Sequence, residues 1–248
     1  MSTGVPTPTP GSRRTRPARG AEWSVRGVGY GREARDVVAQ VERDEVERPI
    51  VAQLEAMGWT HVPGKEIGTL DAVTPLLTDK LEAALRRINR RAADNEPWMD
   101  ATDVARSIAE LTSVSLGRGI AQANFDATEM LLSGHVLTGP SAEHGGTSAT
   151  VQYVEWRPEA DRFALNEFTV VDQLRVENRS GEVSILDLVL FVNGIPLVAV
   201  ECKSPDLADP IRSAVLDLRR YAGDPVKEDE RDGTDLPVPA GVPELFRT

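Results

Sequence analysis

The sequence predicts an α/β fold in which helices flank a mixed central β-sheet, with a helical insertion. The first observation is a pair of segments, 185–192 and 195–203, that are dominated by Val, Leu, Ile and Phe and separated by Asn193-Gly194. Asn-Gly between two apolar runs is a strong signal for a β-hairpin, so we expect two adjacent antiparallel strands. The second observation is that apolar residues recur at helical spacing before and after this hairpin. At 248 residues the chain can bury a substantial core in one domain.

The first expected helix covers residues 45–57. Its apolar stripe comprises Ile50, Val51, Leu54 and Met57. Gly58 is suited to end the helix. Glu47 lies near the stripe, because it precedes three of its members by three, four and seven residues. An acid in the first turn is also favoured by the helix dipole alone, without any functional site.

Three further amphipathic patterns predict a helical layer at about residues 75–133. The three segments are 77–88, 104–111 and 118–132. A Gly-, Ser- and Thr-rich stretch follows at 138–150. We interpret His135 and His144, which flank or interrupt this stretch, as loop residues because no Cys or His lies at metal-ligand spacing from them.

A last helix is expected shortly after the hairpin. Asp209 is suited to the N-cap and Pro210 to the first helical position. Apolar residues then recur at helical spacing and predict one buried face. This stripe comprises Ile211, Ala214, Val215, Leu218 and Tyr221.

The hairpin carries three charged groups that its apolar context does not explain. Asp187 lies within the first strand, whereas Glu201 and Lys203 lie two apart at the end of the second and therefore share a face. Burial of a charge is costly unless the charge is paired or binds a metal ion. An ordinary strand-end ion pair would explain Glu201 and Lys203 only. Two carboxylates that converge from adjacent strands would form a site for a hard divalent cation, with the ammonium beside it to orient or deprotonate a water molecule.

The register of the hairpin tests the metal-site interpretation. If Asn193-Gly194 formed a two-residue loop without a bulge, Asp187 would fall opposite Val200, on the wrong face of the sheet. A three-residue loop or a β-bulge would place Asp187 opposite Glu201. We therefore expect one of these two irregular connections.

At these residues the sequence resembles a known family. Asp187, Glu201 and Lys203 resemble the Asp…Glu-x-Lys core of the PD-(D/E)xK nuclease superfamily. The fuller pattern Asp-x-x-x-Phe-x-Asn-Gly-x-Pro-Leu-x-x-x-Glu-x-Lys is more specific, and it resembles the N-terminal nuclease domain of the type I restriction enzyme R (restriction) subunit. Segment 165–174 looks like the Asn-x-Phe-x-Val-x-x-Gln sequence that leads into the catalytic hairpin of that family.

The resemblance covers about residues 40–246, is strongest from 163 to 222, and implies a restriction-endonuclease-like fold. The catalytic residues that it implies are Asp187, Glu201 and Lys203. The implied metal ligands are Asp187, Glu201, Glu47 and Cys202, the last through its backbone carbonyl, since alternation turns the Cys202 side chain into the core. Glu45 is the alternative to Glu47 as the acid of the first helix.

Two positions depart from the family pattern. Leu186 precedes Asp187 where the superfamily name implies Pro, a residue without a chemical task. At 217–221 the chain reads Asp-Leu-Arg-Arg-Tyr, where the family usually has Gln-x-x-x-Tyr, a motif thought to contact DNA or to order the site. Tyr221 and Asp217 are therefore the candidate DNA-binding residues, although Asp217 brings a negative charge near phosphate. A solvated helix face with Tyr221 packed on the sheet is the alternative.

The ends of the chain differ from its centre. Residues 1–22 are rich in Pro, Thr, Gly and Arg and predict a disordered basic arm without a signal peptide. We assign 23–222 to the nuclease domain and 223–248 to an acidic, Pro-rich tail. The sequence contains no Walker phosphate loop, so the chain is expected to end before the ATP-driven motor of the resembled subunit. One cysteine and no membrane-length apolar run favour a cytoplasmic protein.

The expected function is Mg²⁺-dependent hydrolysis of DNA phosphodiester bonds by a type I restriction endonuclease domain, in defence against foreign DNA. The expected partners are double-stranded DNA and the specificity and methylation subunits of a restriction complex, with no membrane. The net charge of −11 leads us to expect weak DNA binding by the isolated chain. Two alternatives are a repair or recombination nuclease of the same fold and an inactive remnant that serves as a protein-interaction module.

Overall fold

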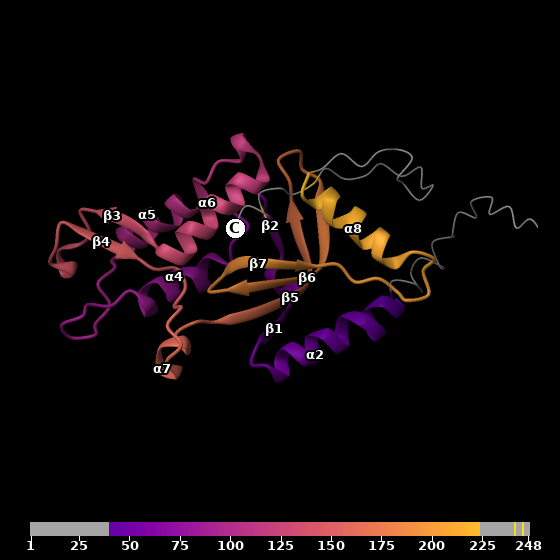
Figure 1. Ribbon diagram of the computed structural model, residues 1–248, viewed down its shortest axis with the longest axis horizontal. Coiled ribbons are helices and arrows are strands. Elements are labelled where there is room, and N and C mark those ends of the chain that lie inside the picture. Colours follow the sequence, from indigo (N-terminus) through magenta and orange to yellow (C-terminus); the bar gives the residue numbers. More distant parts are fainter. Residues whose placement is uncertain (1–39, 224–240, 242–244, 246–248) are drawn as a thin grey trace, which may run out of the picture.

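A mixed β-sheet with helices on both faces forms the centre of the protein, as the sequence predicts (Figure 1). The computed structural model describes residues 40–223 together with 241 and 245. The expected basic arm (1–22) and nearly all of the expected tail (223–248) lie outside the described residues. Within the described part, every helix is too short or too polar to cross a membrane.

The sheet is built around β5 (Phe168–Glu177) and β6 (Val183–Val192), its two longest strands. β6 runs antiparallel to both β5 and β7 (Ile195–Val200). β1 (Thr60–Pro63) and β2 (Thr69–Asp71) pair in parallel with successive parts of the other edge of β5. The sheet therefore contains both parallel and antiparallel pairs, in the order β1-β5-β6-β7.

The first helical segment confirms the helix expected at 45–57. It consists of a π-helical turn, η1 (Arg43–Glu47), that continues into α2 (Arg48–Ala56). Gly58 follows with a φ of +95°, a conformation that ends the helix and that glycine adopts readily. Apolar residues of α2 pack on one face of the sheet, where the buried members of the cluster are Val51, Val170, Leu188 and Cys202.

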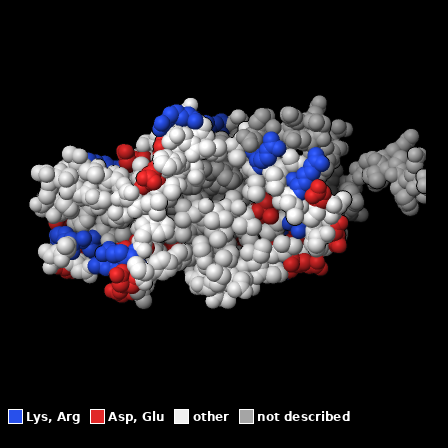
Figure 2. All heavy atoms as spheres, in the orientation of Figure 1, with Lys and Arg blue, Asp and Glu red and all other residues white. Residues whose placement is uncertain are grey.

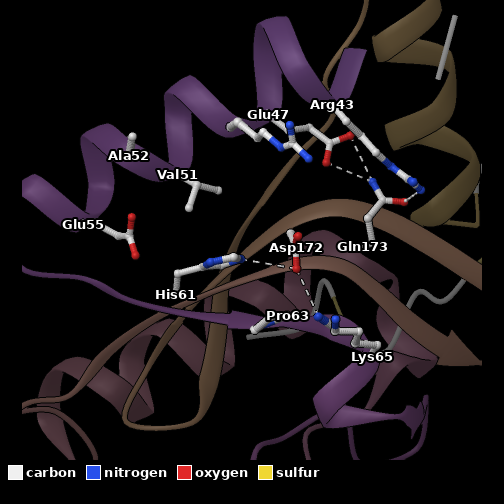
Figure 3. Close-up of a pocket in the computed structure, with 12 residues that line it drawn as sticks. Arg43, Glu47, Val51, Ala52, Glu55, His61, Pro63, Lys65, Asp172 and Gln173 are labelled. Carbon is white, nitrogen blue, oxygen red and sulfur yellow. Dashed lines mark hydrogen bonds and ion pairs between the residues drawn. The ribbon is translucent and has the colours of Figure 1, made fainter. Parts of the chain in front are cut away.

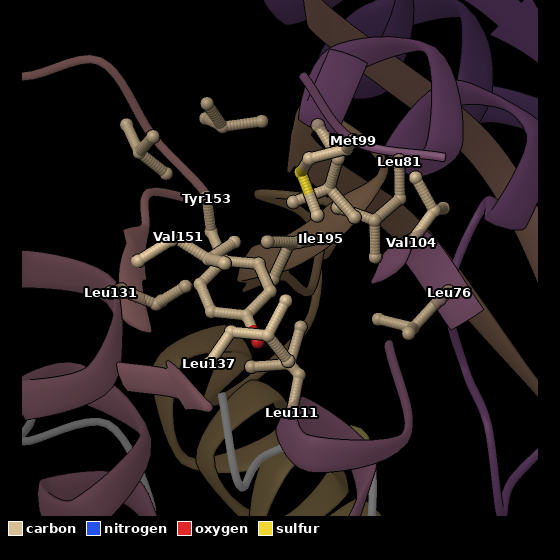
Figure 4. Close-up of a cluster of buried hydrophobic side chains, with 14 of the residues drawn as sticks. Leu76, Leu81, Met99, Val104, Leu111, Leu131, Leu137, Val151, Tyr153 and Ile195 are labelled. Carbon is tan, nitrogen blue, oxygen red and sulfur yellow. The ribbon is translucent and has the colours of Figure 1, made fainter. Parts of the chain in front are cut away.

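Three longer helices confirm the predicted helical layer: α4 (Thr78–Ile88), α5 (Ala101–Thr112) and α6 (Ile120–Ser133). They share a core cluster with the tip of the β6–β7 hairpin, through Val192 and Ile195. Figure 4 shows the ring of Tyr153 at the centre of this cluster, and its hydroxyl donates a hydrogen bond of 2.6 Å to the Ser107 carbonyl. The layer therefore holds the loop end of the hairpin in place. The short helices are α3 (Gly64–Ile67), η2 (Leu116–Arg118), η3 (Ala142–His144) and α7 (Ala160–Phe163).

The interpretation of His135 and His144 as loop residues was wrong. β3 (His135–Thr138) and β4 (Ser148–Val151) form an antiparallel pair, so His135 is a strand residue, while His144 lies in η3. The Gly-, Ser- and Thr-rich composition marks only the connection between these strands. Their alternate residues Leu137, Ala149 and Val151 pack into the core of the helical layer.

The last expected helix is α8 (Pro210–Tyr221), and the Asp209 side chain caps it by accepting a hydrogen bond of 3.1 Å from the Arg212 N–H. Its predicted apolar stripe is only half buried. Tyr221 and Leu218 pack against the face of the sheet opposite α2, whereas Ile211 and Val215 are 78% and 49% exposed. The prediction of one buried face along the whole helix was therefore wrong, because only the C-terminal half of α8 reaches the sheet.

Candidate active site

A β-bulge decides which residue of the hairpin faces Asp187. The loop has two residues, both with positive φ, and the bulge beyond it inserts Leu197 as an extra residue in β7. The register past the bulge continues to Leu188 and Val200, so Asp187 stands opposite Glu201, the residue directly after β7. Of the two irregular connections that we expected, a three-residue loop or a β-bulge, the structure confirms the β-bulge.

Both strands that precede the site change face at the level of Asp187. On each strand, two buried residues that lie three positions apart pack in the same cluster with α8. Regular alternation would place two such residues on opposite faces of the sheet. These pairs are Val171 and Leu174 on β5, and Leu186 and Val189 on β6. In β5 the change coincides with Gln173, whose φ of +49° is unusual for a residue other than glycine. The break lets Gln173 and Asp187 meet Glu47, which comes from the helical segment on the other face.

The amide of Gln173 joins the first two acids of the site. Its Nε2 donates hydrogen bonds to Glu47 Oε1 and Oε2 at 3.0 and 3.1 Å and to Asp187 Oδ1 at 3.2 Å. The side-chain oxygen of Gln173, Oε1, in turn accepts a hydrogen bond from Arg43 Nη2 at 3.0 Å, and Figure 3 shows Arg43, Glu47 and Gln173 pointing toward one another. Glu45, the alternative acid, is exposed, so Glu47 is the acid that this helical segment contributes to the cluster.

Glu47 is an electrostatically strained group. Its side chain is buried in the first helical segment, at the π-helical turn. Burial, and then the negative charge of Asp187, raise the pKa of Glu47 to about 7, despite the hydrogen bonds from Gln173. Excess negative charge at neutral pH is what a bound cation would relieve.

The ammonium of Lys203 is held between two carboxylates just after the end of β7. Lys203 Nζ lies 2.6 Å from Glu201 Oε1 and 2.8 Å from Asp217 Oδ2, the latter on α8. Burial alone would lower the pKa of Lys203, but its hydrogen bonds to Asp217 and Glu201 outweigh burial and raise that pKa above its ordinary value. The expected strand-end ion pair therefore exists, with a third member that the sequence did not predict.

The side chain of Glu201 is also buried, being 4% exposed. Its pKa is raised to about 8 by burial and then by the charge of Asp187, in spite of Lys203. Its second oxygen, Oε2, is buried and has no hydrogen-bond partner among the described residues. An unpartnered buried carboxylate oxygen next to other acids is suited to bind a cation.

Cys202 ties Asp187 to the segment after β7. Its backbone N–H donates a hydrogen bond of 2.8 Å to Asp187 Oδ2. Its thiol is buried in the cluster beneath α2, as alternation predicts, and burial followed by the charge of Asp187 raises the pKa of the thiol to about 12. The side chain is therefore an inert core residue. The carbonyl of Cys202 as a metal ligand stays a prediction.

The residues fit a hard cation by charge and donor type. Glu47, Asp187 and Glu201 offer oxygen ligands, and burial followed by the charge of Asp187 raises the pKa values of Glu47 and Glu201, so a bound cation would favour their charged forms. Among the described residues, however, no three His, Cys, Asp or Glu side chains are already arranged closely enough to hold a metal ion. The Gln173 amide occupies the space between Glu47 and Asp187, so an ion there requires that amide to move.

A cavity of about 610 Å³ lies beside Glu47 and Gln173 (Figure 3). Side chains of both charges line it, among them Arg43, Lys65 and Asp172. Asp172 accepts a hydrogen bond of 3.1 Å from the Gly64 N–H, where an added Cβ would meet the Asp172 carbonyl at 2.3 Å. Of the three acids of the site, Glu47 lines this cavity, so a ligand in the cavity would reach Glu47 from the α2 side.

The candidate DNA-binding residues both have partners within the chain. Tyr221 is buried, and its hydroxyl donates a hydrogen bond of 2.9 Å to the Ile185 carbonyl, as in the alternative that packs Tyr221 on the sheet. Asp217 pairs with Lys203 and with Arg220 Nη2, the latter at 3.1 Å. DNA contacts at Tyr221 and Asp217 stay predictions.

Comparison with known proteins agrees with the resemblance found in the sequence. A family described as the type I restriction enzyme R protein N terminus matches residues 39–246. The chain belongs to this family. A curated relative is the type I restriction enzyme HindI endonuclease subunit of Haemophilus influenzae, which is 25% identical over 171 residues. That alignment covers 65% of this chain and 15% of the relative, so the chain spans a small part of the curated protein that it matches. No solved structure matched.

Gln173 and Asn166 belong to segment 165–174, which resembles the family, but we predicted no role for either residue from the sequence. Asn166 Oδ1 accepts from the Glu155 N–H and from Asn193 Nδ2, both at 2.9 Å, and so fixes the hairpin loop. Gln173 bridges the acids. The signal for both was their place in the family-like pattern, in which Asn166 lies just before β5 and Gln173 lies within it.

Proposed function

We propose that this chain is the endonuclease domain of a type I restriction enzyme R subunit and hydrolyses DNA phosphodiester bonds with the help of Mg²⁺. One observation carries the proposal: acids from the first helical segment, β6 and the end of β7 converge, and the Lys203 ammonium is paired within the same group. Membership of the family supports it.

The chain's own residues have distinct roles in this proposal. Asp187 and Glu201 would hold the metal ion, Glu47 and the Cys202 carbonyl would support it, and the bound ion would lower the pKa of a water and offset charge on the phosphate. Lys203, with its raised pKa, stays protonated at neutral pH. We therefore assign Lys203 to orienting the attacking water and stabilising developing negative charge, and not to removing a proton.

The surface supports weak DNA binding by the chain alone. On the face seen in Figure 2, Lys and Arg occur in small, separate groups, several of them next to Asp or Glu. Affinity for DNA grows with the number of phosphates that a protein neutralises, and this face offers no broad basic area. We propose that other parts of a restriction complex, including its specificity and methylation subunits, supply most of the DNA affinity and the choice of sequence.

A nicking assay on supercoiled plasmid, with Mg²⁺ or Mn²⁺ and with EDTA, tests the proposal. Asp187→Asn and Lys203→Ala should each abolish metal-dependent cleavage, since each removes a group that touches the metal or the reacting atoms. Glu47→Gln should weaken metal-dependent cleavage, because Glu47 would support the metal ion. Glu45→Gln is its matched control, since it changes an exposed acid in the same helical turn and should cut like the wild type.

The assay also separates the alternatives. A wild-type chain that neither cuts nor binds Mg²⁺ or Mn²⁺ in calorimetry would overturn the proposal and favour an inactive interaction module. Cleavage without copurification of methylation and specificity subunits would instead favour a repair or recombination nuclease.

A further inference from the structure

Asp217 holds the ammonium of Lys203 from an element that does not belong to the hairpin. Lys203 lies three residues past β7, whereas Asp217 lies in the third turn of α8, and their charged atoms are 2.8 Å apart. The Lys203 side chain is 15% exposed and that of Asp217 is 28% exposed, so water screens this pair less than it would a surface pair.

Asp217 is itself braced. Arg220, one turn along α8, donates to Asp217 Oδ1 at 3.1 Å. The Arg220 guanidinium lies over the ring of Tyr221, 4.6 Å from its centroid, and the Tyr221 hydroxyl donates a hydrogen bond to the Ile185 carbonyl of β6. The carboxylate of Asp217 is therefore fixed relative to β6, the strand that carries Asp187.

A lysine needs more than one contact to hold its ammonium in one place. Its side chain is a flexible four-carbon stem, and it loses much rotamer entropy when it is ordered. Glu201 alone would leave Lys203 free to turn about a single contact. The second contact, from Asp217, defines the direction in which the remaining N–H of the ammonium points.

Sharing the ammonium also changes what Glu201 can do. Glu201 contacts Lys203 through Oε1 only, and its Oε2 has no hydrogen-bond partner in the part of the chain that the structure describes. Since Asp217 supplies the second negative charge beside the ammonium, Glu201 does not have to turn both oxygens toward it. One oxygen of Glu201 stays available for a cation.

On the basis of the function proposed above, we propose that Asp217 is a positioning residue, which aligns the Lys203 ammonium for catalysis and leaves Glu201 Oε2 free for the metal ion. In the related pattern this place usually holds Gln, so this chain uses a charged acceptor where an amide is usual. Asp217 faces Lys203 and Arg220 and has no contact with DNA in this role.

Direct observation of the Lys203 ammonium tests the proposal without any need for cleavage. The chain has only four lysines, at 65, 80, 203 and 227, so side-chain ¹⁵N NMR signals are easily assigned. A slowly exchanging Lys203 NH₃⁺ signal should be present in the wild type, be lost in Asp217→Ala, and persist in Asp217→Asn, which keeps an acceptor oxygen. Lys80, which is paired with Glu167, is an internal control that should not change. An unchanged Lys203 signal in Asp217→Ala would overturn the proposal.

Cleavage kinetics add a readout that a purely structural role would not move. Asp217→Ala should lower kcat for plasmid nicking by about tenfold, the size expected for a lost hydrogen bond to a charged group, with KM unchanged. Asp217→Asn should recover most of the loss. Asp206→Asn, at an exposed acid between β7 and α8, is the matched control. A change in KM alone, or an equal loss of kcat in the Asn and Ala variants, would contradict a positioning role. A wild type that does not cut would refute the proposed function, and the NMR result alone would then decide whether Asp217 positions Lys203.

Discussion

The backbone N–H of Cys202 donates a 2.8 Å hydrogen bond to Asp187 Oδ2, and this contact ties β6 to the segment that carries Glu201 and Lys203. The other oxygen of Asp187 accepts from the Gln173 amide at 3.2 Å. One oxygen is thus bound to rigid backbone and the other to a side chain that can rotate. A metal ion that approaches Asp187 would therefore compete with Gln173 and not with Cys202.

Removing the Gln173 amide should strengthen metal binding. Without this donor, Glu47 and Asp187 repel each other, so Mg²⁺ should raise the melting temperature of Gln173→Ala and Gln173→Gly more than that of the wild type. Comparing the two variants separates the lost amide from backbone strain, because alanine keeps the Cβ that disfavours the φ of +49°, as Gln173 does, whereas glycine adopts this φ readily. Scanning fluorimetry over a Mg²⁺ series measures the effect. Gln122→Ala, which removes an amide paired with Asp126 on α6, is the control. An equal or smaller Mg²⁺ response in both Gln173 variants would contradict the role of the amide.

The metal-free protein should be less stable at about pH 8 than at about pH 5. Glu47 and Glu201 have pKa values raised from 4.5 to about 7 and about 8, so between those limits the folded state binds more protons than the unfolded state. Stability therefore falls as pH rises through this window, by on the order of a few kcal/mol.

Urea denaturation at several pH values in EDTA measures this dependence. Glu47→Gln and Glu201→Gln should each flatten it, while Glu45→Gln should leave it unchanged because Glu45 is exposed. Stability that increases between about pH 5 and pH 8 in the wild type would show that the acids are not strained.

Gly194→Ala should destabilise the fold strongly. Its φ is +81°, and an added Cβ would lie 2.4 Å from the Leu77 carbonyl oxygen and 2.9 Å from the Leu81 nitrogen, which are backbone atoms that cannot turn aside. We expect a loss of about 2–5 kcal/mol. Gly58→Ala is the control, since its φ is +95° but, apart from its chain neighbours, no described residue has an atom within 4 Å of the added Cβ, so only the backbone penalty of about 1–2 kcal/mol applies. Equal losses in chemical denaturation would refute the clash.

Cys202 should resist thiol reagents until the protein unfolds. It is the single cysteine of the chain, it is 2% exposed, and the pKa of its thiol is raised to about 12. The reactive thiolate is therefore scarce at neutral pH. Labelling with a chromogenic disulfide reagent should be slow in buffer and rapid in urea. Fast labelling of the native protein would show that the segment after β7 opens.

Residues whose placement follows from local pattern were predicted well. The Asn193-Gly194 loop, the end of the first helix near Gly58 and the cap at Asp209 depend on φ preferences and hydrogen bonds within a few residues. The parallel strands β1 and β2 and the β3–β4 pair were missed, because short strands carry little periodicity and their partners lie far away in sequence.

The amino-acid sequence by itself determined the family, the hairpin, the helical layer and the identity of three charged groups that required partners. It predicted an irregular connection that would place Asp187 opposite Glu201, because a regular two-residue loop would have left the two acids on opposite faces of the sheet. Only the tertiary structure decided the details of the site. The extra residue Leu197 sets the register of the hairpin, and Glu47, not Glu45, is the acid from the first helical segment. The Gln173 amide lies between two acids, and Asp217 is the second partner of Lys203. Those contacts join elements that are distant in the chain, and their geometry depends on how α2 and α8 pack on opposite faces of one sheet.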